Sequence, residues 1–145
     1  MREPVPGGGS AAALAGAMGA ALLGMAARYS LRKGKCEQVE KDIEGFIVIV
    51  DAARLKFIEW TGRDAQAYLD VVHTRKSGDK EAYRLAQIEA SHVPGDIIAA
   101  CKECLALTPL LYREGNPHLL SDVKAAEAFL KAGIDAANYM QEANA

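Results

Sequence analysis

The segment from residue 11 to residue 27 limits the fold most strongly, because it carries no charge and consists mainly of Ala and Gly. A membrane helix needs ~20 strongly apolar residues, and this run is short and only weakly apolar. Its lead-in, residues 1–10, has two prolines, three consecutive glycines and no net charge, which is a poor start for a signal peptide. We expect a buried helix and no membrane contact. A membrane-associated helical protein is the alternative.

Small residues recur at every fourth position of this segment. Ala12, Gly16, Ala20 and Gly24 would form one helix face that is almost bare backbone. Such a face allows another helix to approach closely. Each glycine costs ~1 kcal/mol relative to Ala in an isolated helix, so close packing or a ligand must offset that cost.

The rest of the chain shows helical periodicity and almost no strand signal. We expect the first helix to begin with Ser10 as its N-cap and to end near Leu31. A second apolar stripe begins near Glu37 and continues through Val72, either as one long helix or as two divided at Thr61-Gly62.

A third helix is expected from about Lys80 to Leu107, kinked at Pro94, and Thr108-Pro109 either ends it or begins a further short turn. A last helix follows, with Ser121 or Asp122 as its cap. The whole predicts an all-α antiparallel bundle of about four to six helices, one kinked by proline, in a single domain spanning residues 1–145.

Charge and cysteine content exclude further classes. Lys plus Arg is 17 and Asp plus Glu is 19, whereas a nucleic-acid-binding protein is usually basic. Three cysteines form an odd and sparse set, which favours a reducing cytoplasm over a secreted disulfide framework. Cys101 and Cys104 have metal-like spacing, but Cys36 and the three histidines show no paired spacing that could complete a zinc site. We expect no metal.

The glycine-rich stretch Gly7–Gly9 is the strongest local motif. Glycines before a helix N-terminus present backbone N–H groups and a positive dipole end to an anion or a carbonyl. The stretch is neither a P-loop nor a dinucleotide fingerprint, because no Gly-Lys-Ser/Thr follows and no strand precedes it. A flexible lead-in to a capped helix is the competing interpretation.

Other polar residues have two interpretations each. Asp122, with Asn116 nearby, is either a helix cap or a general acid or base where helices converge. Asp64, beside Arg63, is either on a solvated helix face or in a site. The basic cluster at residues 28–35 is either a solvated helix end or a binding site for an acidic ligand tail.

These elements, taken in order, resemble the cyclodeaminase/cyclohydrolase family, which includes formiminotetrahydrofolate cyclodeaminase and methenyltetrahydrofolate cyclohydrolase. The resemblance covers nearly the whole chain, and its most specific part is the run from Pro4 to Ser10 followed by the Ala/Gly helix. Weaker matches lie at Lys35–Val39, Asp64–Tyr68, Val93-Pro94, Gly115–Pro117, Ser121-Asp122 and Ala137-Asn138.

The resemblance implies an all-α fold, a homodimer, and a tetrahydrofolate derivative as substrate, with no bound cofactor and no metal. The reaction would centre on the carbon that bridges N5 and N10. In the cyclodeaminase reaction N10 attacks the formimino carbon and ammonia leaves. In the cyclohydrolase reaction water attacks the methenyl carbon and the ring opens.

Roles for individual residues follow from the same resemblance. Asp122 would be the acid or base, and Asn116 would orient the substrate. The basic cluster at residues 28–35 would meet the glutamate tail. The remaining substrate-binding residues would be Pro6, Gly7, Gly8, Gly9, Ser10, Asp64 and Lys35.

Two departures from the family pattern support a second hypothesis. The segment Arg75–Lys80 is shorter than the corresponding family loop, and only Met1 to Glu3 stand where the family usually has a helix before the glycine-rich loop. The alternative is therefore a catalytically inactive folate-binding or scaffold bundle of the same family.

Overall fold

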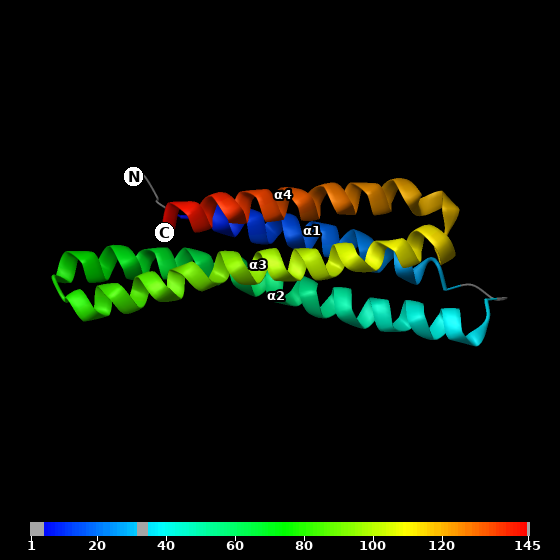
Figure 1. Cartoon of the computed structure of the whole chain (residues 1–145), viewed down its shortest axis with the longest axis horizontal. Coiled ribbons are helices and arrows are strands. Elements are labelled where there is room, and N and C mark those ends of the chain that lie inside the picture. The colour runs from blue at the N-terminus through cyan, green and yellow to red at the C-terminus, as the bar shows by residue number, and fades with distance from the viewer. Residues whose placement is uncertain (1–4, 32–34, 145) are drawn as a thin grey trace.

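The computed structural model describes residues 5–31 and 35–144, and long α-helices make up most of them. The helices are α1 (Gly8–Arg28), α2 (Glu37–Ser77), α3 (Lys80–Glu114) and α4 (Leu120–Asn144), with a short 3-10 turn at Pro117–Leu119 before α4. Consecutive helices run antiparallel (Figure 1). The described residues contain no strand, so the predicted all-α antiparallel bundle is confirmed.

α1 packs mainly on α2 and α4, and α3 lies diagonally opposite it. The glycines explain how closely these helices approach. A methyl group at Gly16 would lie 2.6 Å from the ring of Phe57 on α2, and one at Gly19 would lie 3.0 Å from the carbonyl oxygen of Ala126 on α4. The predicted small-residue face is buried at all four of its positions, Ala12, Gly16, Ala20 and Gly24.

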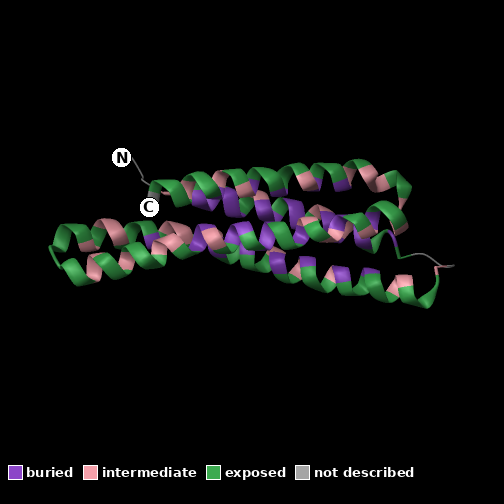
Figure 2. Ribbon diagram, viewed as in Figure 1, coloured by how far each residue is buried: buried purple, intermediate pink, exposed green. Residues whose placement is uncertain are grey.

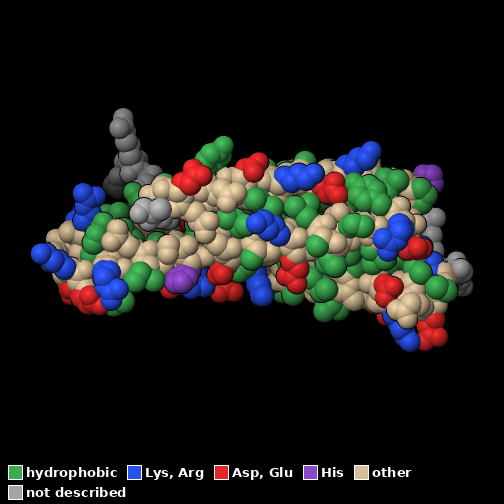
Figure 3. All heavy atoms as spheres, viewed as in Figure 1, with side chains coloured by type: hydrophobic (Ala, Val, Ile, Leu, Met, Phe, Trp, Pro, Cys, Tyr) green, Lys and Arg blue, Asp and Glu red, His purple; other side chains and the backbone are tan. Residues whose placement is uncertain are grey.

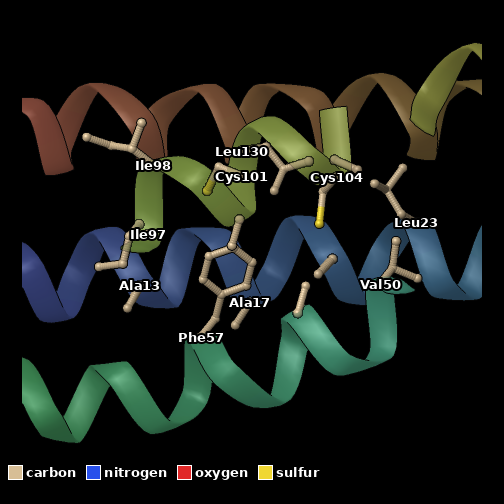
Figure 4. Packing of buried hydrophobic residues seen from close by; sticks show 14 of the residues in the cluster. Ala13, Ala17, Leu23, Val50, Phe57, Ile97, Ile98, Cys101, Cys104 and Leu130 are labelled. Carbon is tan, nitrogen blue, oxygen red and sulfur yellow. The ribbon is translucent and has the colours of Figure 1, made fainter. Parts of the chain in front are cut away.

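The core lies where the four helices overlap (Figure 2), and its side chains come from every helix (Figure 4). The ring of Phe57 is fully buried and meets Trp60 edge to face, with 5.6 Å between ring centroids. α1 is long and apolar enough to span a membrane, but 61% of its most apolar window is buried inside the bundle. Its composition is therefore explained by packing against α2 and α4.

Several predicted helix ends are wrong. α1 begins at Gly8 with Gly7 as its N-cap, so Ser10 lies in the first turn, and the helix ends at Arg28. α3 does not end at Thr108-Pro109 but continues to Glu114. The reason is tertiary packing: Thr108 and Leu111 are both buried, and this burial outweighs the hydrogen bond that a proline removes.

The start of α4 also differs from the prediction. Asn116 caps the 3-10 turn, because its side-chain oxygen accepts a hydrogen bond from the His118 N–H at 3.1 Å. Neither Ser121 nor Asp122 is therefore the cap, and both lie inside α4. Thr61-Gly62, where a break was considered, lies within the single helix α2.

α2 and α3 extend beyond the other two helices as a two-helix hairpin (left in Figure 1). Its turn is tight because Gly78 adopts φ 78°, the left-handed conformation that glycine tolerates best. Asp79 then caps α3 by accepting hydrogen bonds from the N–H groups of Glu81 and Ala82. Charged side chains of both signs gather at this tip (Figure 3).

Cys36 is expected to be the one thiol of the three that reacts readily in the folded protein. It is exposed, whereas Cys101 and Cys104 are buried. Burial raises the pKa of Cys101 to about 12 and that of Cys104 to about 11, so both stay protonated near neutral pH, and the thiolate is the reactive form. A colorimetric thiol titration at pH 8 checks this. Fast reaction of more than one thiol per native chain would contradict it, and denatured protein is the control.

Candidate functional site

A cavity of about 370 Å³ opens where the N-terminus of α1 meets α2, the base of the α2–α3 hairpin and the end of α4. The glycine-rich stretch Gly7–Gly9 forms one wall, and Asp64 and Tyr68 on α2 contribute the polar side chains of another. The other lining residues are apolar and come from all the surrounding segments: Val5, Val71, Ala90, Met140 and Ala143. The cavity therefore combines backbone donors, one carboxylate and an aromatic ring in a mostly apolar setting.

The carboxylate of Asp64 is held against the first turn of α1. The buried Ser10 hydroxyl lies 3.0 Å from Asp64 Oδ2 and 2.9 Å from the carbonyl oxygen of Thr61, so it ties α1 to α2. A methyl group at Gly9 would overlap the Asp64 carboxylate. The first N–H groups of a helix have no partner within the helix, and its N-terminus favours negative charge. This end of α1 is thus suited to hold a carboxylate.

Replacing Gly9 by Ala is expected to destabilise the protein by about 1–3 kcal/mol, because the methyl group must displace Asp64. The gain in helix propensity offsets only ~1 kcal/mol of that. Gly45→Ala is the matched control. Gly45 is an exposed residue of α2, and an added methyl group would have nothing within 4 Å. This substitution should therefore raise the free energy of unfolding by about 0.5–1 kcal/mol. Urea denaturation measures both, and equal shifts in the same direction would show that Gly9 is not constrained.

Three lining residues of α2 share one helix face. Asp64, Tyr68 and Val71 are spaced by four and three residues, which places them in a row. Tyr68 belongs to the segment Asp64–Tyr68 that carries part of the family resemblance, so it had a signal. Val5 lies within the N-terminal motif, whereas Ala90 and Ala143 had no signal, because only the crossing of the helices brings them to the cavity.

Three further predicted site residues lie at the opposite end of the bundle. The main-chain N–H of Asn116 donates to the Ser30 hydroxyl at 2.8 Å, just beyond the C-terminus of α1. The Lys35 ammonium donates to the carbonyl oxygen of Glu114 nearby, and Asp122 lies half-buried in the first turn of α4. α1 has 21 residues and is therefore about 30 Å long. A single chain does not bring Asp122 and Asn116 to the cavity.

Other predicted elements lie away from the cavity lining. Pro6 is exposed. Of the basic cluster, Arg28 forms an ion pair with Asp51, while Arg32 and Lys33, like Pro4 of the N-terminal motif, lie outside the described residues. The short segment Arg75–Lys80 forms the hairpin turn, and none of its residues lines the cavity. The described cavity walls are therefore built without this segment.

The ionisable groups of the described residues form no cluster of three that could hold a metal ion. Beside the cavity, Arg63 on α2 pairs with Glu89 on α3. Arg63 donates a hydrogen bond to Glu89 and lowers the pKa of its carboxyl. Both side chains are exposed, and exposed ion pairs contribute little to stability. The Arg63–Glu89 pair joins α2 and α3 at the base of the hairpin. Asp64 is the one carboxylate in the described lining of the cavity and can take part in proton transfer.

These features define a helical bundle with a cavity for a small ligand that has both polar and apolar parts. A sequence profile of the family described as formiminotransferase-cyclodeaminase matches residues 1–145. A methenyltetrahydrofolate cyclohydrolase of Methylorubrum extorquens is 30% identical over 143 residues, which cover 92% of this chain and 69% of that protein. The crystal structure of a formiminotetrahydrofolate cyclodeaminase from Thermotoga maritima superposes with a TM-score of 0.92 at 30% identity, covering 99% of this chain and 72% of that one.

The chain therefore belongs to the formiminotransferase-cyclodeaminase family. The resemblance inferred from the N-terminal glycines and the Ala/Gly helix is confirmed. Enzymes are known in this family, and the two named relatives act on folates. The relatives carry two different activities, so they leave the reaction of this chain open.

Proposed function

We propose that this protein is an enzyme of folate one-carbon metabolism that acts on the carbon bridging N5 and N10 of tetrahydrofolate. The observation that carries the proposal is the position of the Asp64 carboxylate beside the glycine-rich stretch, within one cavity. The cavity volume of about 370 Å³ is at the lower end of ligand sites, which span roughly 300–1,000 Å³. It can hold the pterin and the one-carbon unit, with the glutamate tail extending outside.

The residues of this cavity supply what the two candidate reactions share. Both reactions form a tetrahedral carbon and move protons, so a carboxylate at the reacting nitrogen or water is the main requirement. Asp64 takes that position, and the backbone N–H groups at Gly8 and Gly9 can donate to a pterin carbonyl. Tyr68 offers an aromatic face for stacking. In hydrolysis the carboxylate accepts a proton from water as the water oxygen bonds to the methenyl carbon. The bond from that carbon to one nitrogen then breaks, and this nitrogen takes the proton from the carboxyl group. The ring opens as the new hydroxyl group loses its proton to solvent and becomes the formyl carbonyl.

Titration calorimetry with tetrahydrofolate and its methenyl form tests the proposal. We expect both to bind, and the absorbance of the methenyl species to report turnover. Loss of that absorbance indicates a cyclohydrolase, whereas its formation from the formimino compound with release of ammonia indicates a cyclodeaminase. Binding without turnover would support the inactive folate-binding alternative, and the absence of binding would refute both.

We further propose that the enzyme is a cytoplasmic homodimer. Three free cysteines are typical of a reducing compartment. The exposed side of α1 carries Leu14 and Met18, with exposed fractions of 51% and 40%, and no charged residue between Gly8 and Ala27. Such a surface is typical of a subunit interface. Size-exclusion chromatography with light scattering in detergent-free buffer tests this, and a monomer at micromolar concentration would contradict it.

A further inference from the structure

The two oxygens of the Asp64 carboxylate have different neighbours. The Ser10 hydroxyl donates to Oδ2 at 3.0 Å. A methyl group at Gly9 would lie closest to Oδ1, so Oδ1 is turned toward the Gly9 backbone. The adjacent Arg63 pairs with Glu89 of α3 and not with Asp64. Among the described residues, Ser10 is therefore the side chain whose hydrogen bond orients this carboxylate.

Ser10 lies behind Asp64 as seen from the cavity. Its exposed fraction is 2%, and it is not one of the residues that line the cavity, whereas Gly9 and Asp64 are. The family resemblance implied that Ser10 binds the substrate, but a ligand in the cavity meets the Asp64 carboxylate and not the Ser10 hydroxyl. An effect of this hydroxyl on the reaction must therefore pass through Asp64.

The Ser10 hydroxyl has one proton and two acceptors within reach. Its oxygen is 2.9 Å from the carbonyl oxygen of Thr61 and 3.0 Å from Asp64 Oδ2. A carbonyl oxygen has two lone pairs, so that of Thr61 can accept this hydrogen bond in addition to the one within α2. A buried donor without a partner is costly. Because a second acceptor is present, the hydroxyl can turn away from Asp64 without losing its hydrogen bond.

From this geometry, and resting on the proposed function, we infer that Ser10 is the positioning residue of Asp64 and keeps its carboxyl group hydrogen-bonded in both protonation states. Ser10 donates to Oδ2 while the carboxylate is ionised, and it does the same when a proton lies on Oδ1. A proton on Oδ2 is donated to the Ser10 oxygen, and the Ser10 proton then turns to the Thr61 carbonyl oxygen. Ser10 keeps its own proton throughout and changes only its acceptor.

This arrangement suits a carboxyl group that accepts a proton and returns it within one turnover. A group that only donates, such as an ammonium, supports the ionised oxygen alone, whereas a hydroxyl both donates and accepts. Orientation matters for the rate, because a displacement of about 1 Å can cost about 10²-fold. Ser10 therefore acts on kcat, through the position of Asp64, and has little effect on substrate binding.

Comparing Ser10→Ala with Thr108→Val tests the inference. Thr108 is the matched control because it is buried and its hydroxyl also reaches one carboxylate oxygen, Glu127 Oε1 at 2.8 Å, and one helix carbonyl, that of Leu105 at 3.0 Å. It does not line the cavity. Both variants should lower the urea midpoint by a similar amount. Ser10→Ala should also lower kcat for the methenyl or the formimino substrate by about 10–100-fold, with KM changed by no more than about two-fold.

Thr108→Val should keep the wild-type kcat. If it loses as much as Ser10→Ala, the loss reports only stability, and the inference is overturned. An unchanged kcat in Ser10→Ala, or a rise of KM without a fall of kcat, would overturn it as well. Each of these results leaves the folate function standing, because the wild type still turns over its substrate.

The double variant Ser10→Ala/Asp64→Asn shows whether Ser10 acts through Asp64. Single-turnover measurements with enzyme in excess give its slow rate. Adding Ser10→Ala to Asp64→Asn should lower the rate no further, because the group that Ser10 positions no longer exchanges a proton. If the two losses multiply, Ser10 has a role separate from Asp64 and the inference is wrong. A wild type that turns over neither substrate would refute the proposed function itself, and with it the role of Ser10.

Discussion

Asn in place of Asp64 is expected to lower kcat/KM for the methenyl or the formimino substrate by about 10²–10⁴-fold, the usual contribution of a positioned acid or base. Asn keeps the shape of the side chain, so the Ser10 hydroxyl and the Gly9 backbone retain their neighbour. What is lost is the ability to accept and return a proton in the cavity. The melting temperature should therefore change little while the rate falls.

The matched control for this variant is Asp70→Asn. Asp70 is on the same helix, is exposed, and accepts a hydrogen bond from the Gln66 side chain at 2.8 Å, but it does not line the cavity. Steady-state rates of the two variants, with circular dichroism to confirm the fold, give the comparison. If Asp64→Asn stays within a few-fold of wild type, Asp64 does not carry proton transfer.

Ala in place of Phe57 is expected to lower the free energy of unfolding by about 3–5 kcal/mol. The ring is fully buried, lies directly over Gly16 of α1 and contacts Trp60. Its removal leaves a cavity in the α1–α2 contact that Gly16, with no side chain, cannot fill. Because small domains have a net stability of about 5–15 kcal/mol, the loss should be plain in urea denaturation.

Val48→Ala serves as the control for Phe57→Ala. Val48 is on the same helix and has an exposed fraction of 69%, so its truncation should change stability by no more than about 0.5 kcal/mol. A double variant also locates the effect, because Gly16→Ala should destabilise wild type but be tolerated in Phe57→Ala. If Gly16→Ala costs the same in both backgrounds, the ring and the glycine are not coupled.

The helices and their buried faces were predictable because they depend on local periodicity. The fourth-residue spacing from Ala12 to Gly24 identified the face on which α2 and α4 pack. Helix ends were less predictable, because they depend on neighbours that are distant in sequence. Ser10 has the chemistry of an N-cap, yet its hydroxyl contacts Asp64, fifty-four positions away. Thr108-Pro109 has the pattern of a helix end, yet α3 continues past it because Thr108 and Leu111 are buried.

The candidate site was predictable only in part. Gly7–Gly9 and Asp64 share the cavity, as the motif and the family resemblance implied. The family resemblance also implied that Asp122 and Asn116 belong to this site. A sequence does not show directly which helix ends lie close together. In the folded chain Asp122 and Asn116 are separated from the cavity by about the length of α1.

The sequence by itself determined an all-α bundle, a tightly packed first helix and a glycine-rich helix start suited to a polar ligand. These follow from side-chain size and periodicity, which act over a few residues. The tertiary structure alone decided that Gly9 must be glycine, because Asp64 packs on it, and that α1 keeps one apolar side uncovered. Both depend on how the helices cross, and that is settled by the packing of all four helices at once.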